Sequence, residues 1–286
     1  MAGTIYLVAT PIGNLEDITL RALRVLREAD VIACEDTRHT RRLLDHYQIQ
    51  KPLVSYHEHN EAARAEELVE RAIAGSAVAV VSDAGMPGIS DPGYRVVACA
   101  IARGVTLASI PGPTAAAAAL AVSGLPAEAF RFGGFLPPKQ TQRRKLLESL
   151  AAESATLVFY EAPHRILESL EDVITVLGPR PVVVARELTK VHEEFLRGTA
   201  DEVLAVLRGR ESIKGEITLL IARGPVPAVA AATVRERVEQ LMSEQHLERM
   251  DALKLAARER GISKREAYKQ WEENGSCQSK ARESAF

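Results

Sequence analysis

The stretch AVAVVSDAGMPGISDPG, residues 77–93, joins an apolar run to a loop crowded with turn residues and acids. Ala77–Val81 is continuously apolar, which is typical of a strand buried on both faces of a parallel sheet. The loop behind it holds three glycines, two prolines and two aspartates. A plain connection between a strand and a helix needs only about two or three such residues. The surplus indicates that this loop does more than turn the chain.

Strand-like runs alternate with helix-like segments on both sides of this stretch. The runs at 4–9, 30–34, 53–56, 77–81 and 106–110 predict strands, and the segments 17–26, 37–47 and 61–74 have helical periodicity. Such alternation favours a parallel sheet with helices on both faces. We therefore expect an N-terminal α/β domain over residues 1–124.

The next hundred residues predict a sheet of another kind. Strand-like runs occupy 132–135, 155–159, 181–185, 194–198 and 216–221. The runs at 181–185 and 194–198 lie too close together for a helical crossover, so we expect them to be antiparallel. Residues 125–224 are thus predicted to form a second α/β domain with a mixed sheet, and the fold class is α/β with two α/β domains.

The composition changes again after Gly224. A short Ala/Val-rich linker at 226–233 leads to a charged helical extension, residues 234–272, in which Gly261 separates two helical segments. Helix, glycine turn and helix in succession are typical of a helix-turn-helix. Residues 273–286 are predicted to be a disordered tail.

Composition bounds the class of protein. The 286 residues are 47% hydrophobic and 26% charged with a net charge of −2, which is ordinary for a soluble globular protein. No run is long enough to span a membrane, and the N-terminus does not resemble a signal peptide. The cysteines Cys34, Cys99 and Cys277 have neither disulfide nor metal-site spacing. We expect a cytoplasmic protein without a metal, and the net charge neither favours nor excludes a polyanionic partner.

Three loops with unusual composition follow predicted strands of the first sheet: Thr10–Asn14, Ser82–Asp91 and Ile110–Thr114. Ligands of open parallel sheets bind at this edge. The loops contain no lysine, and Asp83 and Asp91 would repel phosphate, so a ligand with positive charge and an aromatic ring is favoured. Asp91 has an alternative role, because with Pro92 it could cap a helix running to Ile101.

Several long motifs occur in order along the chain: ATPIGNLEDIT (9–19), CEDTRHT (34–40), SDAGMPGISDPG (82–93), PGPTA (111–115) and YEAPHR (160–165). Together they resemble the tetrapyrrole-methylase-like superfamily, over about residues 3–224. The likeness is greatest to the bacterial branch that methylates small-subunit ribosomal RNA. The helical extension is similar to that of the same branch.

The resemblance implies two α/β domains with S-adenosylmethionine in the cleft between them, in a homodimer. It implies methyl transfer to the ribose 2′-oxygen of a cytidine in the decoding region of 16S rRNA, within the small ribosomal subunit. The residues that match cofactor-facing positions are Pro11, Gly13, Asp83, Gly85, Met86, Pro87, Ser90, Asp91, Pro111, Gly112, Thr114 and Ala115.

A ribose hydroxyl is a poor nucleophile at neutral pH, so its methylation needs positioning and a base or a polarising cation. Two groups of acidic and basic residues follow predicted strands and are the catalytic candidates: Glu35, Asp36, Arg38, Glu161, His164 and Arg165. Glu161 and His164 could instead serve the first turn of a helix starting at Pro163, and the arginines could simply pair with the acids. Arg186, Glu187 and Lys190 are a weaker third group.

Basic clusters are the candidates for RNA contact: Arg41 and Arg42; Lys139, Arg143 and Arg144; Lys254, Arg258, Lys264 and Arg265. Phosphate contacts from such groups give an affinity that weakens with salt, although clusters of this kind are often only solvated surfaces. Two other functions remain possible on the sequence: methylation of a small molecule such as a tetrapyrrole precursor, and non-catalytic binding to the ribosome.

Overall fold

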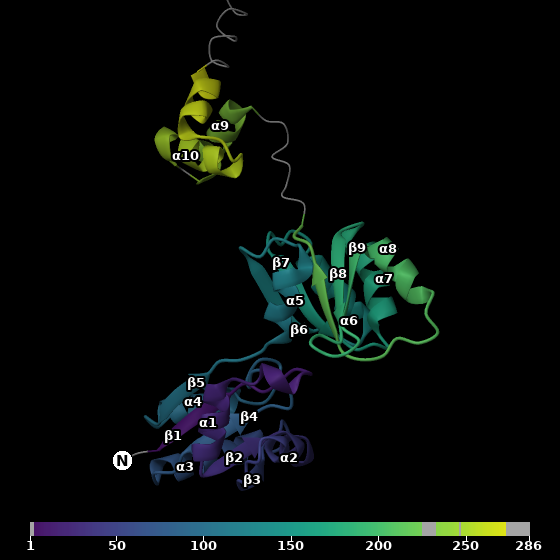
Figure 1. Ribbon diagram of the computed structural model, residues 1–286. Coiled ribbons are helices and arrows are strands. Elements are labelled where there is room, and N and C mark those ends of the chain that lie inside the picture. The colour runs from purple at the N-terminus through teal and green to yellow at the C-terminus, as the bar shows by residue number, and fades with distance from the viewer. Residues whose placement is uncertain (1–2, 225–232, 246, 273–286) are drawn as a thin grey trace, which may run out of the picture. The chain divides into compact units, whose positions relative to one another are not determined.

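Two five-stranded sheets and a helical unit make up residues 3–224, 233–245 and 247–272, the part of the chain that the computed structural model describes (Figure 1). The chain divides after Gly224, so that both sheets belong to the first unit and the C-terminal helices to the second. The predicted linker at 226–233, apart from Thr233, and the predicted tail at 273–286, with Cys277, lie outside the described residues.

The first sheet is parallel throughout, as the alternation of strands and helices predicts. Its strands are β1 (Thr4–Val8), β2 (Val31–Cys34), β3 (Leu53–Ser55), β4 (Val78–Val81) and β5 (Thr106–Ile110), in the order β3-β2-β4-β1-β5. Every residue of β2 and β4 is buried. This explains why the sequence of both strands is apolar without alternation.

Helices cover both faces of this sheet. They are α1 (Leu20–Glu28), α2 (Thr37–His46), α3 (Glu61–Ile73) and α4 (Tyr94–Ala102), with a 3₁₀ turn, η1, at Leu15–Asp17. Along β4, Ala79 and Val81 pack with residues of α1 and α2, while Val78 and Val80 pack with residues of α3 and α4. Successive side chains of a strand point to opposite faces, so each strand contributes to two cores.

The second sheet is mixed, in the order β6-β7-β10-β8-β9. Its strands are β6 (Phe130–Phe135), β7 (Thr156–Glu161), β8 (Pro181–Arg186), β9 (Glu194–Thr199) and β10 (Ile217–Ile221). Strands β6 and β7 are parallel and the other pairs are antiparallel. The antiparallel pairing of β8 with β9 confirms the inference from their short connection.

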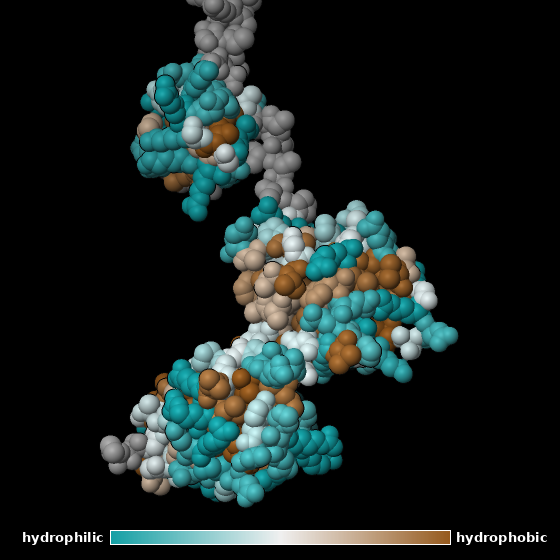
Figure 2. Space-filling model, viewed as in Figure 1, coloured by the Kyte–Doolittle hydropathy of each residue, from teal (hydrophilic) through white to brown (hydrophobic). Residues whose placement is uncertain are grey.

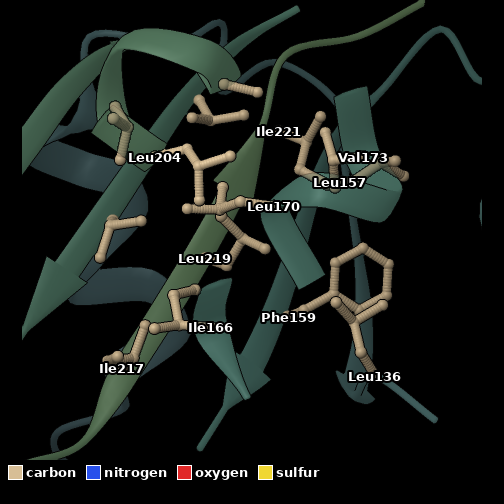
Figure 3. Packing of buried hydrophobic residues seen from close by; sticks show 14 of the residues in the cluster. Leu136, Leu157, Phe159, Ile166, Leu170, Val173, Leu204, Ile217, Leu219 and Ile221 are labelled. Carbon is tan, nitrogen blue, oxygen red and sulfur yellow. The ribbon is translucent and has the colours of Figure 1, made fainter. Parts of the chain in front are cut away.

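Different helices pack on the two faces of the second sheet. On one face α6 (Gln140–Ser149), α7 (Ile166–Leu177) and α8 (Ala200–Arg208) enclose a hydrophobic core around Leu170 and Leu219 (Figure 3). On the other face, Ala116, Ala119 and Leu120 of α5 (Ala115–Ser123) pack with strand residues including Val158 and Val183. Helix α5 precedes residue 124, yet it covers the second sheet; small alanines allow this close approach.

A buried ion pair joins α6 to α7. Arg143 Nε donates to Asp172 Oδ2 at 2.7 Å, and both side chains are fully buried. Arg144 Nε donates to the other carboxylate oxygen at 2.6 Å, and the carbonyls of Pro137 and Pro138 accept from Arg143 Nη1. Arg143 is therefore not available to RNA phosphate, and its prediction as an RNA contact is wrong, because sequence spacing did not reveal its buried partner.

The pair makes a sharp test of the core. Asp172→Ala leaves the Arg143 guanidinium buried without its carboxylate, so we expect the free energy of unfolding to fall by about 3–5 kcal/mol. Its neighbour Glu171 forms only a surface pair with Arg208, and Glu171→Ala should change the same quantity by less than about 1 kcal/mol. Urea titrations of both variants measure the difference. Equal effects would contradict a structural role for the buried pair.

The helical unit contains α9 (Val234–Gln245), α10 (Arg249–Glu259) and a helical segment at 264–272. Val238, Leu241, Leu253 and Ala267 form its buried core. Gly261, between α10 and the last segment, has φ of 63°, a left-handed conformation that suits glycine after a helix. The face of this helical unit that is visible in Figure 2 is mostly hydrophilic. Within the described residues no helix is long and apolar enough to cross a membrane.

Candidate functional site

Backbone hydrogen bonds tie the three loops at the carboxyl edge of the first sheet together. Thr10 and Gly85 form an isolated antiparallel bridge, in which each N–H donates to the other carbonyl at 2.9 and 3.0 Å. The Thr10 hydroxyl also donates to the Ser82 carbonyl at 3.1 Å. The N–H of Ala9 donates to the carbonyl of Ile110 at 3.2 Å. The loops that the sequence singled out are thus brought together.

These loops form one side of a cavity of about 480 Å³ in the first unit. The first sheet contributes Ile12, Glu35, Asp83, Ala84, Gly85, Met86, Ile89, Ser90, Asp91, Thr114 and Ala115; the later chain contributes Phe135, Tyr160, Glu161, Ala162, Pro163, Leu188, Gly215, Glu216, Ile217 and Thr218. The lining is mainly apolar, and its charged members are all acids. Ligand sites typically have this size and this mixture of apolar surface with a few polar groups.

Some predicted cofactor residues line the cavity and some do not. Those that do are Asp83, Gly85, Met86, Ser90, Asp91, Thr114 and Ala115; those that lie in the same loops without lining it are Pro11, Gly13, Pro87, Pro111 and Gly112. Gly93 shows why this loop is rich in glycine. A Cβ there would come within 2.7 Å of the Gly88 backbone nitrogen, so the chain can fold back on itself only with glycine.

Asp91 faces the cavity, and the alternative that it caps a helix is wrong. Helix α4 begins at Tyr94 with Gly93 in the capping position. The first backbone N–H groups there are satisfied by the Glu61 carboxylate, which accepts from Gly93 at 3.3 Å and from Arg95 at 3.2 Å. Because a side chain from α3 caps the helix, Asp91 remains available to a ligand.

The acids of the cavity raise one another's proton affinity. Burial raises the pKa of Asp91 to about 7, and the nearby carboxylates of Glu35 and Asp83 add to the shift. Burial, and then Asp83, also raise the pKa of Glu35. Among the residues that the structure describes, no lysine or arginine lines the cavity. A bound cation is therefore favoured, and phosphate is repelled.

The catalytic candidates have different surroundings. The Glu161 carboxylate is buried and accepts from the Ala162 N–H at 2.7 Å, from Arg165 Nε at 2.8 Å, from Arg165 Nη2 and from the Ser169 hydroxyl at 2.5 Å. Four donors favour a role in holding the turn rather than in proton transfer. Glu161 ends β7, and α7 begins at Ile166 rather than at Pro163. His164 is exposed and does not line the cavity.

Asp36 and Arg38 lie beside the cavity without lining it. Asp36 caps α2 and pairs at 2.8 Å with Arg38, an exposed side chain, and this hydrogen bond lowers the pKa of the Asp36 carboxyl. The Asp36 N–H donates to Asp83 Oδ1 at 3.1 Å, which fixes the orientation of the Asp83 side chain. Of the three candidates Glu35, Asp36 and Arg38, Glu35 is the one that lines the cavity.

Sequence reasoning missed two aromatic residues that line the cavity, Phe135 and Tyr160. Their rings meet edge to face with centroids 5.6 Å apart. Both lie at the carboxyl end of a strand, Phe135 at the end of β6 and Tyr160 one residue before the end of β7. An aromatic residue at a strand end beside a turn motif was the signal that could have identified them.

Lys190 connects two turns at the end of the second sheet through its hydrogen bonds to two glutamates. Its ammonium donates to Glu187 Oε1 and Glu216 Oε2, both at 2.9 Å. Leu188, between the members of this network, lines the cavity with Gly215 and Glu216. Arg186 lies next to the network and pairs with Glu194 at 3.0 Å. The third group of candidates from the sequence, Arg186, Glu187 and Lys190, thus supports the residues that line the cavity.

The contact between Gly215 and the Glu187 side chain can be tested by substitution. The φ of Gly215 is 93°, and a Cβ would overlap the carboxyl carbon of Glu187, so Gly215→Ala should lower the free energy of unfolding by about 2–4 kcal/mol. Gly124 has a similar φ of 79° with open space around it, so Gly124→Ala should cost only about 1 kcal/mol. Parallel denaturation curves compare the two. Equal losses would show that the Glu187 contact is unimportant.

Comparisons with known proteins complete the description of the site. Residues 4–204 match the family model described as Tetrapyrrole (Corrin/Porphyrin) Methylases. The chain is 50% identical over 275 residues to ribosomal RNA small subunit methyltransferase I of Halalkalibacterium halodurans, covering 93% of each chain. It is 47% identical over 268 residues to the protein of that name from Xylella fastidiosa, covering 93% of this chain and 98% of the other.

Solved structures agree on the fold. Uroporphyrin-III C-methyl transferase from Thermus thermophilus, complexed with S-adenyl homocysteine, superposes with a TM-score of 0.53 at 23% identity, covering 78% of this chain and 98% of that one. Among the described residues, no group of three or more His, Cys, Asp or Glu side chains is arranged to hold a metal ion.

Proposed function

Because the chain belongs to the tetrapyrrole methylase family, we propose that it transfers a methyl group from S-adenosylmethionine to the ribose 2′-oxygen of a cytidine in the decoding region of 16S rRNA. The observation that carries the proposal is the identity of about half of all residues with proteins named for methylation of small-subunit rRNA. A homodimer in the cytoplasm, with the small ribosomal subunit as substrate, belongs to the same proposal.

The cavity suits this cofactor. A sulfonium carries positive charge, and Glu35, Asp83 and Asp91 provide negative charge without competing cations in the lining. Met86, Leu188 and Tyr160 offer surface for an adenine ring. A polyphosphate nucleotide would find neither lysine nor arginine in the described part of the lining. The residues present therefore fit S-adenosylmethionine and disfavour the phosphate-rich cofactors.

The cofactor would supply an electrophilic methyl group, and the protein must orient the hydroxyl and take its proton. The Glu161 carboxylate already accepts from four donors. We therefore seek the proton acceptor among Glu35, Asp83 and Asp91, the cavity carboxyls from the loops of the first sheet. Asp91, with a pKa of about 7, is suited to accept a proton near neutral pH.

Exposed basic side chains remain as the candidates for RNA contact. Arg41 and Arg42 on α2 and Lys139 before α6 are exposed, and Arg144 is half-buried against Asp172. In the helical unit, Lys254, Arg258, Lys264 and Arg265 are all exposed. Their charge would neutralise phosphates of the target, an interaction that weakens as salt concentration rises.

The decisive experiment is transfer of labelled methyl from S-adenosylmethionine to purified small ribosomal subunits, followed by nuclease mapping of the labelled nucleotide. We expect label on the ribose 2′-oxygen of one cytidine. Label on a base would retain an rRNA methyltransferase and refute ribose specificity. Cofactor binding without any labelled RNA would instead favour a small-molecule methylase.

The helical unit has a prediction of its own. Replacing Lys254, Arg258, Lys264 and Arg265 by alanine should weaken binding to subunits and reduce the slope of log K against log salt by about 0.7 for each phosphate that the variant no longer neutralises. The control removes Arg24, Arg64, Arg71 and Arg103, which pair with glutamates on helices α1 and α3. Filter binding at several salt concentrations measures both slopes. If the slope of log K against log salt is the same for the two variants, the helical unit is excluded as an RNA-binding surface.

A further inference from the structure

Three carboxyls from separate parts of the chain line the same side of the cavity. Glu35 follows β2, Asp83 follows β4, and Asp91 lies in the loop before α4. Within the described residues none of the three takes part in an ion pair, although nearby acids do, among them Asp36 and Glu161. Like charges brought together in a cavity repel one another, so the arrangement is unfavourable until a cation arrives.

The groups around the cluster do not neutralise it. Arg38 is paired with Asp36, Arg165 with Glu161, and Lys190 with Glu187 and Glu216. From the later part of the chain, Tyr160, Glu161 and Glu216 also line the cavity. Among the described residues, the other charged or titratable groups that act on Glu35 are His57, Asp36 and Glu58, and of these only His57 can oppose its negative charge. The Ser82 hydroxyl is a neutral hydrogen-bond partner of Asp91.

We propose that Glu35, Asp83 and Asp91 select the cofactor by its charge, so that the site holds S-adenosylmethionine and releases S-adenosylhomocysteine. The inference rests on the proposed function and adds a specificity device to it. The two molecules differ at the sulfur, which is a cation before transfer and a neutral thioether after it. A site built on carboxyls distinguishes them by that difference alone.

The charge balance of the reaction supports this role. The sulfur–carbon bond breaks with its electron pair remaining on sulfur, and a carbon–oxygen bond forms to the ribose oxygen. The hydroxyl proton leaves to a cavity carboxyl or to water. The positive charge on sulfur is thus lost in the same step that yields a proton, and that proton can neutralise one member of the cluster. The attraction that held the methyl donor is then absent for the product.

The protonation of Asp91 makes the selection depend on pH. In the free protein its pKa is raised to about 7, so the carboxyl is largely protonated at pH 6 and largely ionised at pH 8. A cation binds the ionised form and expels the proton. Affinity for S-adenosylmethionine should therefore rise with pH through about 7, while affinity for S-adenosylhomocysteine should change little.

Calorimetric titration of both ligands into the full-length protein tests the inference. In the wild type we expect the ratio of dissociation constants, S-adenosylhomocysteine over S-adenosylmethionine, to rise about 5- to 10-fold between about pH 6 and pH 8. Asp91→Asn should lower the ratio at the higher pH by a similar factor and remove its pH dependence. Repeating the titrations in buffers of different ionisation enthalpy should detect proton release with S-adenosylmethionine in the wild type only.

Asp45→Asn is the control, because Asp45 is an exposed acid on α2 that does not line the cavity, and its ratio should match the wild type. An unchanged ratio in Asp91→Asn overturns the inference and leaves the proposed function intact. A wild-type protein that binds neither ligand refutes the proposed function itself. If Asp91→Asn does not fold, Glu35→Gln decides: a lower ratio supports charge selection, and the wild-type ratio refutes it.

Discussion

Two hydrogen bonds between Thr10 and Gly85 determine where the rest of the site can lie. They join the loops that follow β1 and β4, neighbouring strands at the centre of the first sheet. Both partners contribute only backbone groups, so the bridge depends on chain conformation, and Gly85 adopts a φ of 81° to make it. With the Ser82 carbonyl also held by Thr10, the chain leaves β4 in a direction that brings Asp83 and Asp91 to the cavity.

The cavity illustrates how a fold can sustain an unfavourable charge distribution. Burial and mutual repulsion both destabilise the ionised forms of Glu35 and Asp91. The surrounding structure compensates with rigid supports: the Glu61 carboxylate caps α4, and the Asp36 N–H holds Asp83. Carboxyls with pKa values raised in this way are characteristic of functional sites, where a ligand supplies the missing interaction.

The main contribution of the second sheet to the cavity is to hold its turns in place by hydrogen bonds. Glu161 and Lys190 each lie at the centre of a hydrogen-bond network that fixes a turn at the cavity. Helix α5 follows directly from the Thr114 loop and packs on the second sheet. The same short segment therefore connects the cavity lining to the core of the second sheet. A change in that core can alter the cavity without touching it.

Local patterns in the sequence were sufficient for most strands and helices, for the parallel first sheet and for one antiparallel pair of the second. The uninterrupted apolar run at 77–81 predicted a buried parallel strand, and the short connection between 185 and 194 predicted an antiparallel pair; both are present. The order of the long motifs was sufficient for the family. These features depend on neighbours in the chain, where periodicity and turn residues act directly.

Only the tertiary structure decided which side chains meet. Arg143 looked like a surface cation until Asp172, far along the chain, proved to be its buried partner. For Asp91 the sequence left two roles open, ligand contact and helix cap, and the Glu61 carboxylate accepts the hydrogen bonds that a cap would accept. Tyr160 and Phe135 joined the cavity because their strands are neighbours in the second sheet. The charge, burial and reach of a side chain depend on partners distant in sequence, and strand order, rather than local propensity, brings those partners together.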